Sequence, residues 1–204
     1  MQHHSYDDDY KSLAIHPYKL MLTLILAGVI MLFIGFSLGY GYTVVTNDLK
    51  PIELPWIFVL NTGILLASSY TITRANKAYL DDDTEAYKKA LYYTIILTGL
   101  FMLMQTIGWG LLFQQNVEQA QGPVKPYLYL LSALHFAHVL AGLPFLLLFY
   151  RVAKKRMQEP VSVLVYFSDP EKRLKLRLLT VYWHFLDALW IALILLFVVF
   201  WFVG

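Results

Sequence analysis

Two pairs of ionisable side chains lie inside long apolar stretches of the sequence, where they could perform chemistry or hold helices together. His184 and Asp187 occur in the stretch YWHFLDALW, and His135 and His138 occur in SALHFAHVLAG. The members of each pair are three residues apart, so their side chains project from nearly the same face of a helix. A polar group in lipid is costly unless it finds a partner, so each pair needs an explanation.

Metal or haem ligation is one interpretation of the histidine pair. Two imidazoles on one helix face can ligate a metal, but histidines at positions i and i+3 cannot be the two axial ligands of one haem, which lie on opposite sides of the iron. A dihaem cytochrome would need further histidines on facing helices, and His184 is the only other histidine within an apolar stretch. We favour hydrogen-bonded packing for His135 and His138, with ligation as the alternative.

Asp187 and His184 allow three interpretations. A catalytic relay would need a nucleophile, and the sequence has neither a nucleophile-elbow motif nor a cysteine. A proton-relay carboxylate is more reasonable, because an aspartate within a membrane is a functional candidate by default. We favour a buried polar clamp between helices, or between this chain and a partner, with Trp183 and Trp190 seven residues apart on an adjacent stripe.

Neutral polar residues occur in two further apolar stretches. Asn61 and Ser68 are seven residues apart and share a helix face, Ser69 follows directly, and Gln105 lies in GLFMLMQTIGWG. Hydrogen bonds between packed membrane helices are the ordinary use of such side chains. We expect that role here, with a polar path or a ligand contact as the alternative for the residues around Asn61.

Five apolar stretches of about 20 residues or more must position these side chains, each long enough to cross a hydrocarbon core of about 30 Å. The chain is 58% hydrophobic and its mean hydropathy is +0.55. We therefore expect an all-α integral membrane bundle of five transmembrane helices in a single domain, residues 1–204. The first helix is too long for a signal peptide and is expected to remain in the mature protein. The expected helices cover about 17–45, 54–74, 88–115, 126–151 and 177–203.

The distribution of basic residues predicts the topology. Fourteen of the sixteen Lys and Arg residues fall in the amino-terminal segment and in the second and fourth connections, which share one side after five crossings. The positive-inside rule then places the amino terminus in the cytoplasm and the carboxyl terminus outside. The fourth connection is a candidate contact for anionic lipid head groups, or else only a topology determinant. Its candidate residues are Lys154, Lys155, Arg156, Lys172 and Arg173.

The first helix carries glycines on one face. Gly28, Gly35 and Gly39 follow the spacing i, i+7, i+11, and the last two form a small-xxx-small pair. Such a face lets the backbone of another helix approach closely. We therefore expect a neighbouring helix to pack there.

Four of these motifs resemble subunit III of the haem-copper cytochrome c oxidases. YWHFLDALW resembles the family's Tyr-Trp-His-Phe-Val-Asp-x-x-Trp signature, with Leu186 in place of the usual valine. HFAHV, followed by Gly142, resembles its His-x-x-His-Val motif, and LNTGILLASSYTIT resembles its Asn-Thr and Ser-Ser helix. The run from Gly99 through Gln105 to Trp109 resembles its Gly, Gln and aromatic run. The motifs occur in the family's order.

The resemblance covers roughly residues 54–204, and the five-helix plan resembles the shorter bacterial form of the family. Three positions depart from the family's pattern. Gly108 stands where a glutamate is usual, so any role of that carboxylate is absent or moved. Ala133 and Phe136 replace glycines that are common around the first histidine, so the local packing must differ.

The resemblance implies a non-catalytic subunit of a terminal oxidase in the bacterial inner membrane. Haem and copper would reside in subunits I and II, where electrons from a c-type cytochrome reduce oxygen, and this chain would have no cofactor. It would pack against subunit I, bind phospholipid and support proton uptake. The resemblance also allows a larger respiratory supercomplex, and it implies no nucleic-acid partner. The expected packing or assembly residues are Asn61, Ser68, Ser69, Gln105, His135, His138, Trp183, His184, Asp187 and Trp190.

Three alternatives remain open on the sequence. A quinol oxidase carries a similar subunit III, and no residue here identifies the electron donor. A small proton or solute transporter could use Asp187, although inverted repeats and Gly/Pro-interrupted helix pairs are absent from the sequence. A membrane cytochrome would use His135, His138 and His184 as ligands.

Overall fold

The computed structural model describes residues 17–46, 55–118, 124–157 and 160–203 of the 204-residue chain. Five helices in these ranges are long and apolar enough to cross a membrane, and no strand occurs among the described residues. The predicted all-α fold with five membrane-spanning helices is thus confirmed. The helices are α2 (Pro17–Thr46), α3 (Trp56–Leu80), α4 (Thr84–Glu118), α5 (Val124–Arg156), the short α6 (Pro160–Phe167) and α7 (Pro170–Val203).

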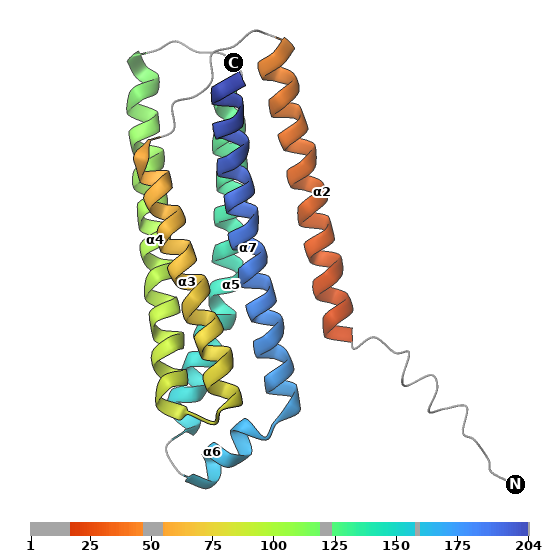
Figure 1. The fold of residues 1–204 in the computed structure, drawn as a ribbon, viewed down its shortest axis with the longest axis vertical. Coiled ribbons are helices and arrows are strands. Elements are labelled where there is room, and N and C mark those ends of the chain that lie inside the picture. Colours follow the sequence, from red (N-terminus) through yellow and green to blue (C-terminus); the bar gives the residue numbers. More distant parts are fainter. Residues whose placement is uncertain (1–16, 47–54, 119–123, 158–159, 204) are drawn as a thin grey trace, which may run out of the picture.

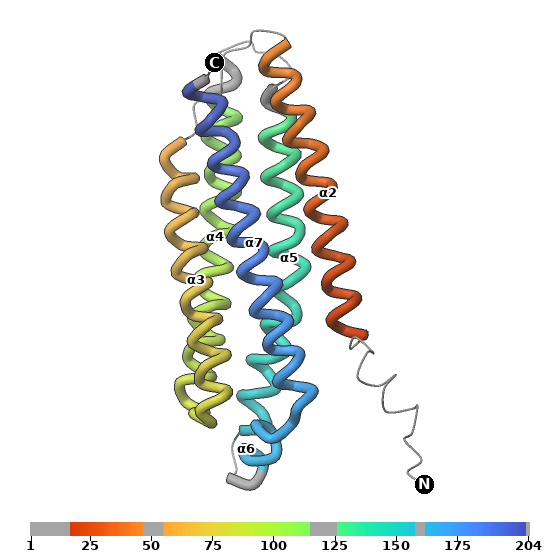
Figure 2. The backbone as a smooth tube through the Cα atoms, turned by 45° about the vertical axis from the view of Figure 1, so that its right-hand side comes forward, coloured from red at the N-terminus to blue at the C-terminus, as the bar shows by residue number. Residues whose placement is uncertain are grey.

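The long helices α3, α4, α5 and α7 form an antiparallel bundle, and α2 lies along its side (Figures 1 and 2). α3 and α4 make the most extensive helix pair, α7 packs against α3 and α5, and α2 touches only α7 and α5 to any extent. Only 11% of the apolar window of α2 is buried. The interior of the bundle is therefore built by four helices, with α2 as a peripheral member.

The turn between α3 and α4 and the short helix α6 lie at the same end of the bundle, which we call the basic end (Figure 1). Apart from Lys125, in the first turn of α5 at the other end of the bundle, the basic residues of α3 to α7 lie in the helix turns nearest the basic end. They are Arg74, Lys77, Lys88, Lys89, Arg151, Lys154, Lys155, Arg156, Lys172, Arg173, Lys175 and Arg177. The charge separation inferred from the sequence is thus a separation in space. The assignment of the basic end to the cytoplasm stays a prediction.

Two aspartates explain why α3 and α4 extend beyond the apolar stretches. Asp82 has a left-handed backbone, with φ 55°, and the Asp83 N–H donates to the Ala78 carbonyl at 3.0 Å, as in a Schellman motif. Aspartate tolerates this conformation better than most residues. Asp83 then caps the next helix, because its carboxylate accepts the Ala86 N–H at 2.9 Å. The two helices are joined by a compact turn.

Another capping aspartate starts α7 at residue 170, well before the apolar stretch. The Asp169 carboxylate accepts the N–H groups of Glu171 and Lys172 at 3.0 and 3.3 Å, and Pro170 occupies the first helical position. The Lys172 ammonium lies 2.8 Å from the same carboxylate. Hydrogen bonding by the Lys172 side chain, and then by the two backbone N–H groups, holds the pKa of Asp169 below its ordinary value of 3.8.

Helix α6 was not expected, because its apolar run PVSVLVYF is too short to be recognised as a span. It is held by aromatic rings at the basic end. The Tyr79 hydroxyl of α3 donates to the Tyr166 carbonyl at 2.9 Å, and the Tyr79 ring meets the rings of Tyr87, Tyr166 and Phe167 with centroids 5.1 to 6.0 Å apart. This aromatic cluster ties α3, α4 and α6 together at the basic end.

The glycine face predicted on α2 makes only one close contact within the chain. A Cβ atom at Gly39 would meet the Tyr127 ring at 3.3 Å, whereas nothing lies within 4 Å at Gly28 or Gly35. Within the described part of this chain no helix packs closely at these two residues, because α2 turns Val29 and Phe33 toward the bundle instead. Closer approaches occur elsewhere: a Cβ at Gly142 of α5 would lie 2.8 Å from the Tyr182 ring and 3.0 Å from the Trp183 ring of α7.

Gly142→Ala should destabilise the bundle by about 1–3 kcal/mol, because the added methyl group forces two packed aromatic rings of α7 to move. The matched control is Gly99→Ala, where nothing lies within 4 Å. There the better helix propensity of alanine should raise stability by up to about 1 kcal/mol. Denaturation of the two purified variants in detergent would test this contrast, and equal shifts would mean that α5 and α7 do not approach closely at Gly142.

Candidate functional site

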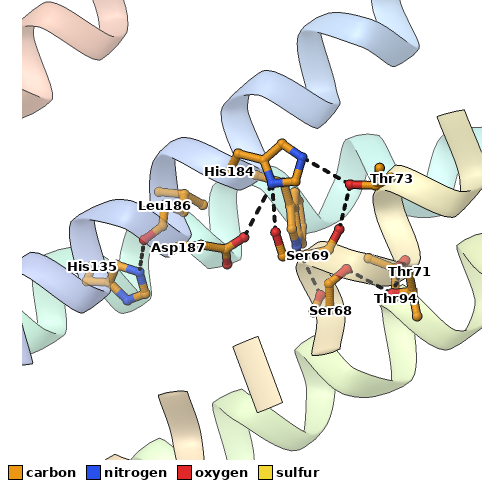
Figure 3. A network of polar contacts seen from close by, with 10 residues as sticks. Ser68, Ser69, Thr71, Thr73, Thr94, His135, His184, Leu186 and Asp187 are labelled. Carbon is orange, nitrogen blue, oxygen red and sulfur yellow. Dashed lines mark hydrogen bonds and ion pairs between the residues drawn. The ribbon is translucent and has the colours of Figure 1, made fainter. Parts of the chain in front are cut away.

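The polar residues singled out in the sequence lie at helix–helix contacts. One group, which we call the His184 cluster, joins α3 to α7 and consists of Ser68, Ser69 and Thr73 of α3 and Trp183, His184 and Asp187 of α7 (Figure 3). These side chains meet because α3 and α7 run side by side. Since two of the α3 residues are consecutive, their side chains lie at different angles around the helix and reach different atoms of α7.

Both ring nitrogens of His184 contact hydroxyl groups of α3. Its Nδ1 lies 2.7 Å from Ser69 Oγ and its Nε2 lies 3.2 Å from Thr73 Oγ1. The Thr73 hydroxyl donates to the Ser69 carbonyl at 2.9 Å, so the Thr73 oxygen can accept a hydrogen bond from an N–H at Nε2. A neutral ring has one donor and one acceptor, so Nδ1 then accepts from the Ser69 hydroxyl. The His184 side chain remains 44% exposed.

Asp187 lies three residues after His184 on the same face of α7. Its side chain is only 7% exposed, and Oδ2 is 3.8 Å from His184 Nδ1, beyond hydrogen-bond length. Neither carboxylate oxygen accepts a well-formed hydrogen bond from the described residues. The Ser69 hydroxyl is close enough to interact, but its single proton cannot serve both Asp187 and His184. With a neutral histidine and an ionised carboxylate the His184 cluster has one donor too few, whereas a proton on Asp187 lets the carboxyl donate to Ser69 and completes the network.

Ser68 carries the network from α7 across α3 to α4. The Trp183 indole N–H donates to Ser68 Oγ at 3.2 Å, and the Ser68 carbonyl accepts the Thr71 hydroxyl at 2.8 Å. Thr71 in turn lies 2.8 Å from Thr94 Oγ1 of α4. Three helices are thus linked at one level of the bundle (Figure 3).

His135 and His138 make different contacts despite their shared helix. His135 is fully buried, and its Nε2–H donates to the Leu186 carbonyl of α7 at 3.1 Å, with the Trp190 ring 5.0 Å away between centroids. His138 donates from Nδ1 to the carbonyl of Leu134, four residues earlier, at 2.7 Å. Each histidine thus donates a hydrogen bond from one ring nitrogen to a backbone carbonyl. No group of three or more His, Cys, Asp or Glu side chains that could hold a metal occurs among the described residues.

A further set of hydrogen bonds lies on the opposite side of His135 from the basic end. Asn61 of α3 donates to Gln105 of α4 at 3.0 Å, and both are 1% exposed. The Trp190 indole donates to Thr62 of α3 at 3.1 Å. The remaining oxygen of Asn61 and the remaining nitrogen of Gln105 have no partner among the described residues. The pair still joins α3 and α4 in a fixed register.

Sequence reasoning missed several hydrogen-bond partners, including Thr73, Thr94 and Ser132. The Trp109 indole of α4 donates to Ser132 of α5 at 2.9 Å. Ser132 lies three residues before His135, on the same face of α5, and this spacing was the available signal.

The departures from the family pattern are accommodated by packing. A Cβ at Gly108 would lie 3.2 Å from the Ile57 side chain and 3.3 Å from the Phe58 ring, so α3 fills the space beyond this position. Phe136 packs on the Trp109 ring with centroids 5.2 Å apart. In this chain, aromatic contacts between helices occupy the neighbourhood in which the family has a glutamate and a glycine.

The basic candidates do not form one cluster. Lys154, Lys155 and Arg156 make up the last turn of α5, where positive charge is favourable near the helix carboxyl terminus. Lys172 instead pairs with Asp169 and lies 4.7 Å from the centre of the Tyr166 ring. Arg173 is exposed on the first turns of α7.

Comparison with known proteins places these motifs in a family. The model of the family described as cytochrome c oxidase subunit III matches residues 30–204. A probable cytochrome c oxidase subunit 3 from Rickettsia prowazekii is 31% identical over 151 residues, which are 74% of this chain and 49% of the relative. Cytochrome c oxidase subunit 3 from Papio hamadryas is 29% identical over 147 residues, which are 72% of this chain and 50% of the relative.

The chain thus spans about half the length of the curated relatives it matches. The matched part contains all the motifs described above, from the Asn61 region of α3 to the YWHFLDALW stretch of α7. The family model covers most of the chain, including four complete membrane-spanning helices and part of α2. The chain belongs to the cytochrome c oxidase subunit III family.

Proposed function

We propose that this chain is a non-catalytic subunit of a haem-copper terminal oxidase, and that it stabilises subunit I and subunit II in the bacterial inner membrane. One observation carries the proposal: the motif residues that match the family make hydrogen bonds between helices of this chain. Trp183, His184 and Trp190 bond to α3, and His135 bonds to α7. Residues used in this way hold a scaffold in one conformation. Haem, copper and oxygen chemistry would then belong to the partner subunits.

Phospholipid binding and support of proton uptake are part of this proposal. The exposed lysines and arginines at the basic end, including Lys155, Arg156 and Arg173, suit the phosphates of anionic lipids. The same charges would attract anionic groups and influence proton entry on the cytoplasmic side. We infer cytochrome c rather than quinol as the electron donor, because the relatives named above are cytochrome c oxidase subunits. A quinol oxidase remains the alternative.

A proton or solute transporter is the second candidate, and Asp187 is the observation in its favour. Its carboxylate is buried and lacks a donor, as expected for a group that exchanges protons. Asn61, Ser68 and His135, by contrast, form hydrogen bonds between helices. The transporter candidate predicts ion or solute flux in proteoliposomes that contain this chain alone, which a scaffold subunit would not produce.

Purification of the tagged chain from its native membrane in mild detergent tests the main proposal. A haem-copper core should co-purify and give a reduced-minus-oxidised haem spectrum, and the haem should stay with the other subunits when this chain is stripped away. Haem retained by the stripped chain would instead indicate that its histidines ligate haem. A colourless chain without oxidase subunits would contradict the proposal and favour the transporter.

Asp187→Leu should weaken association with the oxidase core and leave the haem content of that core unchanged. The reason is that leucine removes the carboxylate from the His184 cluster and cannot take part in its hydrogen bonds. Asp187→Asn is the matched control, since the amide keeps the size and can both donate and accept, and it should retain the core. The ratio of this chain to haem after purification measures the effect. An assembled Asp187→Leu complex without any oxygen reduction would contradict a purely structural role.

The proposed topology can be tested with single cysteines, because the sequence contains none. Thr46→Cys places a thiol at the end of α2 and Lys155→Cys places one at the basic end, and both positions are exposed. An impermeant maleimide should label Thr46→Cys in intact cells, whereas Lys155→Cys should react only after the membrane is opened. The reverse pattern would put the basic end outside.

A further inference from the structure

A cleft lined by charges of both signs lies between α3 and α4 at the basic end. Its volume is about 420 Å³, within the usual range of small-molecule sites. We propose that this cleft binds the head group of an ethanolamine phospholipid, with the phosphate at two cations of α3 and the ammonium at two carboxylates of the α3–α4 turn. The cations are Arg74 and Lys77, and the carboxylates are Asp81 and Asp83.

This inference rests on the lipid-binding part of the proposed function. It adds a site separate from the exposed lysines and arginines of α5 and α7 named there, and it specifies the class of head group.

The four charged side chains of the cleft are exposed, and none of them forms an ion pair with another described residue. Spacing alone does not explain this. Glu171 and Lys175 of α7 are four residues apart and approach to 2.8 Å, whereas Lys77 and Asp81 have the same separation and do not pair. The charges of the cleft are therefore not neutralised within the described chain and can serve a ligand.

Tyr70 holds the Arg74 side chain beside the cleft. The Arg74 Nε–H donates to the Tyr70 hydroxyl at 2.8 Å, and the guanidinium carbon lies 5.3 Å from the centre of the Tyr70 ring. This contact uses one of the five N–H groups of the guanidinium. The terminal N–H groups remain for a phosphate, whose geometry suits a guanidinium. Lys77 lies three residues further along the same face of α3 and adds a second positive charge.

The order of these charges along α3 matches their order in a zwitterionic lipid. Arg74 is the first charged residue of α3, directly after the apolar stretch, and Asp81 lies just beyond the last residue of the helix. The Asp81 backbone is thus roughly 10 Å further from the membrane centre than that of Arg74. In a phospholipid the phosphate joins the glycerol, and the amine lies beyond it, toward water. The cations would therefore meet the phosphate and the carboxylates the ammonium.

The two carboxylates select among head groups. The phosphate of phosphatidylglycerol would meet the two cations but leave both carboxylates without a positive partner. A choline group carries a positive charge but has no N–H to donate. The ethanolamine ammonium has three N–H groups and can make charge-assisted hydrogen bonds to both carboxylates. The Asp83 carboxylate already accepts the Ala86 N–H through one oxygen, which leaves its other oxygen for the ligand.

The inner end of the cleft favours a lipid over a soluble ligand. Tyr70 and Tyr93 line it and are 59% and 56% exposed, as is usual for tyrosines at a membrane–water interface. About one helix turn further in, Leu66 and Ile96 are also exposed. An acyl chain attached to a head group in the cleft can therefore continue along an apolar surface.

Protection of a single cysteine tests the site locally. Ala86→Cys places a thiol in the cleft, and Lys155→Cys, at the same end but outside the cleft, is the matched control. The full-length chain, with any subunits that co-purify, is placed in phosphatidylcholine vesicles and labelled with an uncharged maleimide. Replacing part of this lipid by phosphatidylethanolamine should slow labelling of Ala86→Cys by roughly two- to fivefold, the range for one exposed ion pair, and leave Lys155→Cys unchanged.

Four results would overturn the inference. These are equal labelling of Ala86→Cys with and without phosphatidylethanolamine, equal slowing of Lys155→Cys, equal or greater protection by phosphatidylglycerol, and protection by soluble phosphoethanolamine. The last result would assign the cleft to a soluble compound.

Reversing the charge order tests the chemistry in the Ala86→Cys background. Lys77→Asp combined with Asp81→Lys keeps the composition and net charge, and it should abolish protection by phosphatidylethanolamine. The matched control exchanges Glu171→Lys and Lys175→Glu on α7, outside the cleft, and should keep the protection. Retained protection in the first exchange, or loss in both, would contradict the assignment.

Asp81→Asn is a smaller change that tests the same point if the double exchange impairs folding, which circular dichroism would show. It removes one negative charge, so it should weaken protection by phosphatidylethanolamine and strengthen protection by phosphatidylglycerol. An unchanged preference would mean that Asp81 does not contact the ammonium.

Failure of this inference can be told apart from failure of the proposed function. If no haem-copper core co-purifies but phosphatidylethanolamine protects Ala86→Cys, the oxidase assignment is wrong and the lipid site stands. If the core co-purifies and the lipid gives no protection, the oxidase assignment stands and the lipid site is wrong.

Discussion

The rest of this structure depends on the need of every polar side chain in an apolar surrounding to find a hydrogen-bond partner on another helix. Lipid gives no net hydrophobic driving force between helices, so packing and polar contacts must set how they align. α3 is central to this arrangement. Asn61 reaches α4, while Thr62, Ser68 and Ser69 each contact α7. A rotation or slide of α3 by one residue would break these contacts together, so they fix both its angle and its register.

The contacts of α7 show how one helix can be held from several sides. Its indoles and imidazole bond to α3, while the Leu186 carbonyl accepts from His135 of α5 and the Tyr182 hydroxyl donates to the His138 carbonyl. The small residue Gly142 permits that close approach. α2 is held differently, mainly by aromatic edges such as Tyr40 against Phe197, with centroids 5.1 Å apart. This difference accounts for the peripheral place of α2.

The sequence was sufficient for the five membrane-spanning helices, since apolar length alone identifies them, and for membership of the family, since its motifs survive in order. The partners within the bundle could not be predicted. Helical periodicity says which residues share a face, but not which helix lies opposite, so the different contacts of His135 and His138 required coordinates. The same limit explains why a helix contact was assigned to Gly28 and Gly35, which make none within the described part of this chain. The expected starts of α4 and α7 were too late in the sequence. Asp83 and Asp169 cap polar helical turns there, and hydropathy alone assigns such polar turns to loops.

The exposed fraction distinguishes two kinds of polar side chain that hydrogen-bond between helices. Asn61, Gln105 and His135 are at most 1% exposed, so their hydrogen bonds serve only the interior of this chain. His184 belongs to the same network through Ser69, yet nearly half of its side chain is uncovered at a depth where water is scarce. Exposure therefore separates the polar side chains that serve the interior of the bundle from His184, which joins two helices at its surface.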